Sequence, residues 1–97
     1  MMRKLMKITN SIELLDWFKS AIDVDSDYMV AKLTGLRTQT LSQIRTGKRE
    51  FSELNALKLL LVGEHPDPLE IMAILEAHKA ESRGDEEAAK IWRKSVA

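Results

Sequence analysis

The chain has 97 residues, of which 44% are hydrophobic and 31% charged, with no cysteine and a formal net charge of zero. This length allows one hydrophobic core, and the lack of cysteine excludes disulfides and thiolate metal sites. No apolar run is long enough to span a bilayer, and polar residues from Thr9 to Glu13 exclude a signal peptide, so we expect a soluble cytoplasmic protein.

Two helices are expected in the first third of the chain. The first begins after Asn10 or Ser11, because either side chain can accept a hydrogen bond from a free amide of the first turn, and it runs to about Ile22. Several candidate caps at residues 23–27 precede the second helix, which runs from about Asp27 to Thr34.

A glycine separates the second helix from the third. Gly35 favours the left-handed conformation that ends a helix, and the third helix is expected from about Thr38 to Thr46, where Gly47 stops it in the same way. Ala31 lies four positions before Gly35, and a small residue there lets two helix axes approach. The pattern predicts two short helices joined by a tight turn.

The fourth helix is expected from about Glu53 to Val62, after a basic loop in which Phe51 is the apolar anchor. It carries four leucines, which predict an element of the core: Leu54, Leu57, Leu60 and Leu61. Gly63 and Pro66 end it.

The fifth helix has the clearest start in the chain. Asp67 is placed to cap it, Pro68 fits its first position, and Glu70 completes a capping-box pattern. It is expected to run to about Ser82.

The sixth helix starts at Asp85, with acidic residues in its first turn and basic residues in its last. Its apolar stripe includes Trp92, for which packing within the chain is favoured over a dimer or partner contact. The expected fold is all-α, a compact bundle of about six helices in a single domain, residues 1–97.

The outward face of the helix expected at residues 38–46 is polar but uncharged. With Leu41 and Ile44 toward the core, a turn of about 100° per residue aims five hydrogen-bonding side chains away from it: Thr38, Gln39, Ser42, Gln43 and Thr46. Solvated helix faces are usually rich in Lys and Glu, whereas amides and hydroxyls can donate and accept at base edges. We therefore predict that these five side chains contact DNA bases.

Basic residues flank this helix, and no acidic residue lies between positions 37 and 49. Side chains at the margins of a recognition helix meet phosphates first, which predicts DNA backbone contacts for Arg37, Arg45, Lys48 and Arg49. An ion pair with an acid of residues 23–27 is the alternative for Arg45, and Arg49 could instead enter a minor groove. Weaker candidates for backbone contacts are Lys32, Lys4 and Lys7.

The zero net charge hides an uneven distribution. Residues 1–49 carry nine Lys/Arg and five Asp/Glu, a balance of +4, whereas residues 50–97 carry six and ten, a balance of −4. Because local potential decides where a polyanion docks, the basic half is expected to meet nucleic acid and the acidic half to face away from it.

About residues 11–62 resemble the lambda-repressor-like, or Cro/XRE-type, helix-turn-helix domain. The resemblance is carried by Asp27, Tyr28, Ala31, Lys32, Leu33, Gly35 and Leu36, and then by Gln39, Leu41, Ile44, Gly47 and Lys48. Thr34 departs from the family pattern, in which an apolar residue is commoner at this position. The whole chain is similar to small uncharacterised phage-related proteins that carry this domain.

The resemblance implies a lambda-repressor-like fold at residues 11–62 with two extra C-terminal helices at residues 67–97, packed on that core or on a dimer partner. It also implies that the third helix enters the major groove, with Thr38, Gln39 and Gln43 at base-contacting positions. Members of the family usually bind two half-sites as dimers, so double-stranded DNA and a second copy of the chain are the expected partners.

The expected function is that of a sequence-specific transcriptional regulator, a phage or prophage repressor that occludes an operator as a dimer. The alternative is a protein-binding module, such as an antitoxin or phage accessory factor, on the same scaffold. His65 and His78 lack the spacing of a helical metal pair, and no Ser/His/Asp arrangement stands out. No metal, cofactor, small-molecule ligand, membrane partner or enzyme activity is expected.

Overall fold

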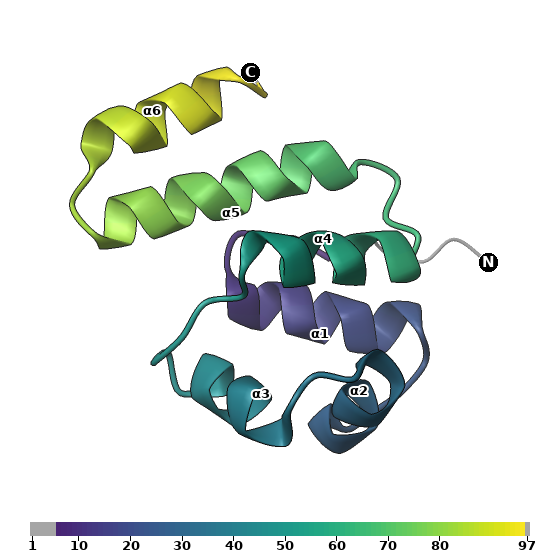
Figure 1. The fold of residues 1–97 in the computed structure, drawn as a ribbon. Coiled ribbons are helices and arrows are strands. Elements are labelled where there is room, and N and C mark those ends of the chain that lie inside the picture. The colour runs from purple at the N-terminus through teal and green to yellow at the C-terminus, as the bar shows by residue number, and fades with distance from the viewer. Residues whose placement is uncertain (1–5, 97) are drawn as a thin grey trace.

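Six α-helices form a layered stack. The computed structural model describes residues 6–96, which contain α1 (Ser11–Ala21), α2 (Asp27–Thr34), α3 (Thr38–Arg45), α4 (Glu53–Val62), α5 (Pro68–Ser82) and α6 (Glu86–Lys94), and no strand. α2 and α3 lie at one end, α1 and α4 in the middle, and α5 and then α6 at the other end (Figure 1). The all-α expectation is confirmed. Within residues 6–96, no helix has the length and apolar character needed to cross a membrane.

Side-chain caps fix most of the helix starts. Asn10 accepts a hydrogen bond from the Glu13 amide at 2.9 Å, as expected for α1, and serine or aspartate caps also precede α2, α4 and α6. The cap expected at Asp67 is wrong, because its side chain accepts no hydrogen bond from the first turn of α5. The Asp67 amide instead donates to Nδ1 of His65 at 2.9 Å, so the preceding turn, with Pro68 after it, sets the start of α5.

The turn between α2 and α3 has the geometry that its glycine predicts. Gly35 has a φ of 78°, and its amide donates to the Ala31 carbonyl at 2.9 Å. Thr34 is buried, and its hydroxyl donates to the Val30 carbonyl at 2.6 Å and accepts from the Leu36 amide at 3.3 Å. This polar residue is therefore satisfied at a position where an apolar one is commoner.

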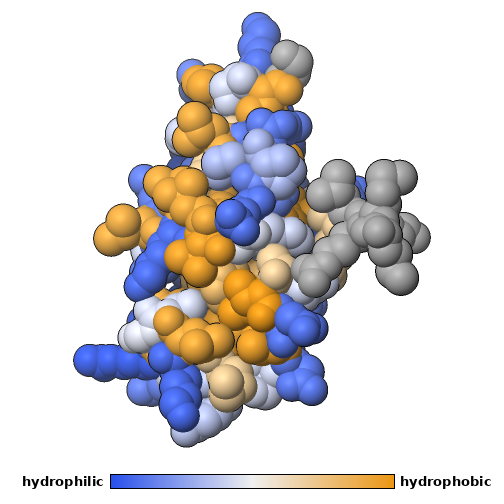
Figure 2. Space-filling model, turned by 90° about the vertical axis from the view of Figure 1, so that its right-hand side faces the viewer, coloured by the Kyte–Doolittle hydropathy of each residue, from blue (hydrophilic) through white to orange (hydrophobic). Residues whose placement is uncertain are grey.

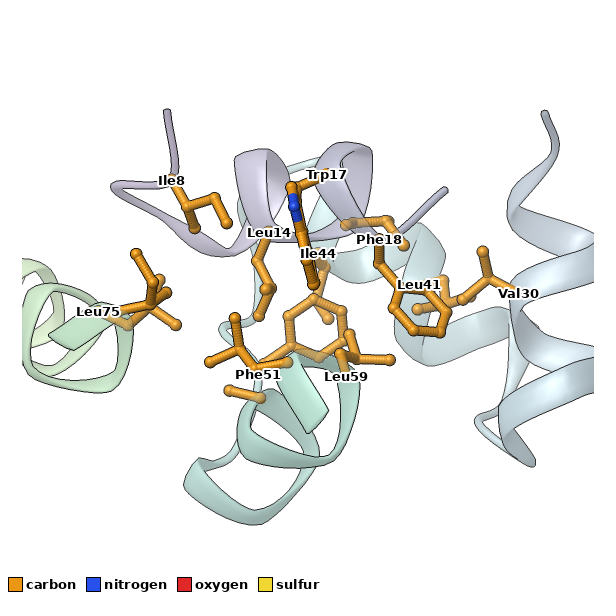
Figure 3. Packing of buried hydrophobic residues seen from close by; sticks show 14 of the residues in the cluster. Ile8, Leu14, Trp17, Phe18, Val30, Leu41, Ile44, Phe51, Leu59 and Leu75 are labelled. Carbon is orange, nitrogen blue, oxygen red and sulfur yellow. The ribbon is translucent and has the colours of Figure 1, made fainter. Parts of the chain in front are cut away.

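The core lies between α1, α3, α4 and the inner face of α5, around Phe18 and Phe51 (Figure 3). Phe51 is 2% exposed, which confirms it as the anchor of the loop before α4. Its amide donates to the Ser11 hydroxyl at 3.0 Å, and that hydroxyl donates to a Glu50 carboxylate oxygen at 2.6 Å. Two polar contacts, one buried and one partly buried, thus tie the loop that follows α3 to the start of α1.

α5 has two different buried faces. Ile71 and Leu75 point into the core cluster, whereas α6 packs against the other side of α5. The buried residues on that other side are small: Ala73, Ala77 and Ala80 on α5, and Ala89 on α6. This alanine seam lets the two helix axes approach closely but buries little apolar surface for each residue.

The junction between α4 and α5 requires a residue without a side chain. A Cβ on Gly63 would lie 2.6 Å from one ring carbon of Trp17 and 3.1 Å from the Leu59 carbonyl. His65 packs edge-on against the same indole ring, with ring centroids 5.0 Å apart. The segment expected to end α4 therefore also covers Trp17.

α4 corrects one expectation. Its Leu59 and Leu60 are fully buried, but Leu54 and Leu61 are 76% and 58% exposed. Of the leucines that were expected in the core, Leu60 lies on the side of the helix that meets it, whereas Leu54 and Leu61 lie on the side that faces solvent. Trp92 is likewise 39% exposed, so its packing within the chain covers only part of the ring.

Candidate nucleic-acid interface

α3 presents its polar face outward because its apolar residues are held in the core. Leu41 and Ile44 are each 1% exposed, so the opposite side of the helix faces solvent. All five side chains predicted to contact bases lie on this outer surface: Thr38, Gln39, Ser42 and Thr46 are exposed, and Gln43 is half-buried. The Thr46 hydroxyl donates to the Gln43 carbonyl at 3.1 Å, which occupies its proton but leaves its oxygen able to accept.

Arg45 is engaged inside the molecule. Its Nε and Nη2 donate to the two carboxylate oxygens of Asp27 at 2.8 and 2.9 Å, and its Nη1 lies 2.6 Å from a carboxylate oxygen of Asp16. The ion pair left as an alternative for Arg45 is therefore present. This guanidinium joins the last turn of α3 to α1 and to the first turn of α2.

The ionisation of this cluster is strongly biased. The pKa of the Asp27 carboxyl lies below its usual range, chiefly because Arg45 donates hydrogen bonds to it. Lys19, whose Nζ lies 3.2 Å from a carboxylate oxygen of Asp27, acts in the same direction. The same contacts with Asp27 and Asp16 raise the pKa of the Arg45 guanidinium. Both shifts favour the charged forms of Asp27 and Arg45, and their ion pair helps to fix the orientation of α3 on α1 and α2.

Three of the four predicted backbone-contacting cations point into solvent. Arg37, Lys48 and Arg49 are exposed, and in the part of the chain that the structure describes none of them forms an ion pair. Arg49 is only weakly held, with its Nη1 3.4 Å from the Thr40 hydroxyl. Arg45 is withdrawn from this set because its guanidinium is committed to two carboxylates.

A small hollow extends the polar surface toward α2. It has a volume of about 270 Å³ and is lined by Tyr28, Ala31, Lys32, Leu36 and Thr38. Tyr28 is 65% exposed and shares the lining of this hollow with Thr38, the first residue of α3. Lys32 and Lys7 are exposed, and Lys4 lies outside the described residues.

Sequence reasoning missed Tyr28 and Asp16 as parts of this surface. Tyr28 was visible in the motif, and a large exposed aromatic one helical turn before Lys32 is a signal that could have found it. Asp16 gave no comparable signal, because its contact with Arg45 joins residues 29 positions apart in the sequence and depends on how α3 packs on α1.

Comparison with known proteins identifies a relative in a virus. The chain is 74% identical over 92 residues to an uncharacterised protein named Gp-c of Pseudoalteromonas phage PM2, an alignment that covers 95% of this chain and 100% of the relative. No protein-family model and no solved structure matches the chain. The chain therefore belongs to the same family as the phage PM2 protein Gp-c.

Proposed function

We propose that the chain binds double-stranded DNA through the outer surface of α3 and acts as a sequence-specific phage transcriptional regulator, a repressor that occludes its operator as a dimer. One observation carries this proposal: an uncharged face of amides and hydroxyls is bordered by three exposed cations that form no ion pair within residues 6–96, Arg37, Lys48 and Arg49. Amides and hydroxyls at the centre can form hydrogen bonds with base edges, and cations at the margin can contact phosphates.

The rigidity of α3 supports the same function. Base readout needs side chains held in register, and α3 is fixed by two buried apolar residues and by the Arg45 contacts with Asp16 and Asp27. The turn at Gly35 and the crossing of α2 and α3 agree with the resemblance to the lambda-repressor-like domain. α5 and α6 lie on the side of the molecule away from α3 (Figure 1), and residues 67–97 carry seven Asp/Glu against five Lys/Arg, so this more acidic part would not face phosphate.

The test is selection of bound sequences from random duplex DNA at a fixed salt concentration. We expect a palindromic consensus, because a two-fold dimer reads two half-sites. Gln39→Ala should then weaken binding to the consensus by about 1–3 kcal/mol and leave binding to random DNA nearly unchanged. Equal losses on both DNAs would rule out base reading by Gln39.

A matched pair of lysines tests the phosphate contacts. Lys48→Ala should weaken binding to every sequence and reduce the slope of log affinity against log salt by about one unit, whereas Lys90→Ala, an exposed lysine on α6, should change neither. If selection enriches no sequence and Lys48→Ala matches the control, the function is not DNA binding, and a protein-binding module is the remaining candidate.

A further inference from the structure

Lys58 is a charged residue on an otherwise apolar side of α4. Leu54, Leu57 and Leu61 lie at positions i, i+3 and i+7 of this helix, and Leu54 and Leu61 are exposed. Lys58 lies four positions after Leu54 and three before Leu61, so it shares their side of the helix. Figure 2 shows apolar side chains gathered over the side of the molecule on which α4 ends. The ammonium group of Lys58 is directed out of this stripe by a partner on another helix.

That partner is the backbone at the end of α2. The Lys58 Nζ donates a hydrogen bond to the Thr34 carbonyl at 2.7 Å. Thr34 is the last residue of α2, and the last four carbonyls of a helix have no amide partner within it. An ammonium group at this point satisfies the carbonyl and lies at the negative end of the helix dipole. Lys58 therefore joins α4 to the residue at which α2 ends.

Cations from other helices thus hold α2 at both of its ends. At its first residue, the Asp27 carboxylate accepts hydrogen bonds from Arg45 of α3 and lies 3.2 Å from the Nζ of Lys19. At its last residue, the Thr34 carbonyl accepts from Lys58. α2 otherwise packs mainly on α3, whereas α4 lies in the middle layer with α1 (Figure 1). Lys58 therefore links the far end of α2 to that layer.

The turn that begins at Thr34 determines where α3 starts. Arg37 precedes α3 and, within residues 6–96, makes no capping hydrogen bond through its side chain, so α3 does not fix its own first turn. The chain reaches Arg37 through the left-handed Gly35 and through Leu36, whose amide donates to the Thr34 hydroxyl at 3.3 Å. The position of Thr34 is therefore passed on to the start of α3.

We propose that Lys58 is a positioning residue, which sets the start of α3 by holding the last carbonyl of α2. Thr38 and Gln39, two of the residues predicted to read bases, lie in that first turn. The inference deepens the proposed function and rests on it, because base reading is where the positioning takes effect. Lys58 touches no DNA in this role, so its loss should lower the discrimination between sequences and leave the phosphate contacts intact.

Hydrogen exchange of the free chain, followed by NMR, tests the positioning without DNA. Lys58→Met keeps an unbranched side chain of similar length but removes the donor, and it should speed exchange of the Gly35 and Leu36 amides at least about threefold, with the amides of α1 unchanged. Lys58→Arg, which restores a cationic donor, should recover most of the protection. Lys90→Met removes an exposed lysine of α6, controls for the loss of charge and should change neither set of amides.

Affinities for the selected consensus and for random duplex DNA test the role in recognition. Lys58→Met should lower the ratio of the two affinities about three- to tenfold and leave the affinity for random DNA and its salt dependence nearly unchanged. Lys58→Arg should restore the ratio. A slope of log affinity against log salt that falls by about one unit would make Lys58 a phosphate contact and overturn the positioning role.

The two measurements separate this inference from the proposed function. Unchanged exchange of the Gly35 and Leu36 amides in Lys58→Met overturns the inference whatever the DNA measurements give. Faster exchange with an unchanged affinity ratio also overturns it, because the turn would then not govern base reading. If exchange responds as expected but no duplex sequence is enriched, the proposed function fails while the control of the turn by Lys58 is supported. Circular dichroism melting of each variant shows that it is folded.

Discussion

The end of the molecule that carries α3 and the end that carries α6 are held together in different ways. Around α3, large side chains such as Phe18 and Phe51 fill the core, and charged groups link the helices. α6 is held on α5 by alanines, while Ile91 and much of Trp92 point away from the chain. The first region is complete within one copy, whereas the second leaves much of its apolar surface outside.

The two regions therefore suit different kinds of contact with other molecules. A surface that reads another molecule by hydrogen bonds needs a rigid support, and α3 has one. A surface that associates through apolar contact needs exposed side chains, and the α5–α6 hairpin leaves those uncovered. If the two regions differ in this way, substitutions in the core should lower stability far more than substitutions in the α5–α6 hairpin.

Shortening one leucine in each region should give very different losses of stability. Leu15 on α1 is fully buried, so Leu15→Ala should lower the free energy of unfolding by about 2–5 kcal/mol. Leu69→Ala, at a position that is 74% exposed, should cost less than about 0.5 kcal/mol when measured by urea denaturation at a concentration where the chain is monomeric. Similar losses would mean that the hairpin is as tightly built as the core.

Native-state hydrogen exchange should separate the two regions without any substitution. α6 rests mainly on α5 through small residues, so we expect its amides to exchange by a local opening at least about 2 kcal/mol less costly than that of α1. Exchange at low protein concentration avoids protection by a dimer. Equal protection of α1 and α6 would contradict a hairpin that opens independently.

Two arginines that form equally short ion pairs should contribute different amounts to the stability of the fold. Arg45→Ala removes contacts with both Asp16 and Asp27 and should cost about 1–2 kcal/mol, because three short contacts are lost and Asp27 keeps only Lys19 as a partner. Arg93 lies 2.6 Å from Glu81, but both side chains are more than half exposed, so Arg93→Ala should cost less than about 0.5 kcal/mol. Thermal melting of both variants measures the difference.

The pH dependence of stability should come from the α3 end. Asp27 has a lower pKa in the folded than in the unfolded chain, chiefly because of Arg45, so it stabilises the fold fully above about pH 5 and loses this effect as pH falls through the lowered pKa. Glu13 acts in the same direction, because the Thr9 hydroxyl and amide donate to its carboxylate. Asp27→Asn should flatten the acid limb of the stability curve measured in urea between pH 2 and 7. An unchanged limb would assign it to other carboxylates.

Much of the fold was predictable because it depends on local chemistry. The cap at Asn10, one of two candidates, and the left-handed turn at Gly35 are set by residues close in sequence, and Phe51 was recognisable as the apolar residue of a basic loop; all three predictions are confirmed. The cap at Asp67 was predicted wrongly, because its side chain accepts no hydrogen bond from the first turn of α5. The Asp67 amide, which Glu70 would accept in a capping box, donates to Nδ1 of His65, and a pattern of residue types does not reveal this.

The parts that the sequence did not predict depend on contacts between distant helices. The pairing of Arg45 with an acid of residues 23–27 was one of two alternatives, and only packing decided for it and added Asp16. The exposure of Leu54 and Leu61 was likewise hidden, because leucine content measures how much surface a helix must bury and not whether its own chain buries it. The roles of Gln39 and its neighbours stay predictions.

The two tryptophans give each region its own optical reporter. Trp17 is 7% exposed between Gly63 and His65, so its emission should be blue-shifted in the folded chain and should report unfolding of the core. Trp92 is 39% exposed, so its emission should lie further to the red and should report the surroundings of α6. Replacing either indole by phenylalanine isolates the other, so fluorescence follows the core and the α6 end as separate signals in one molecule.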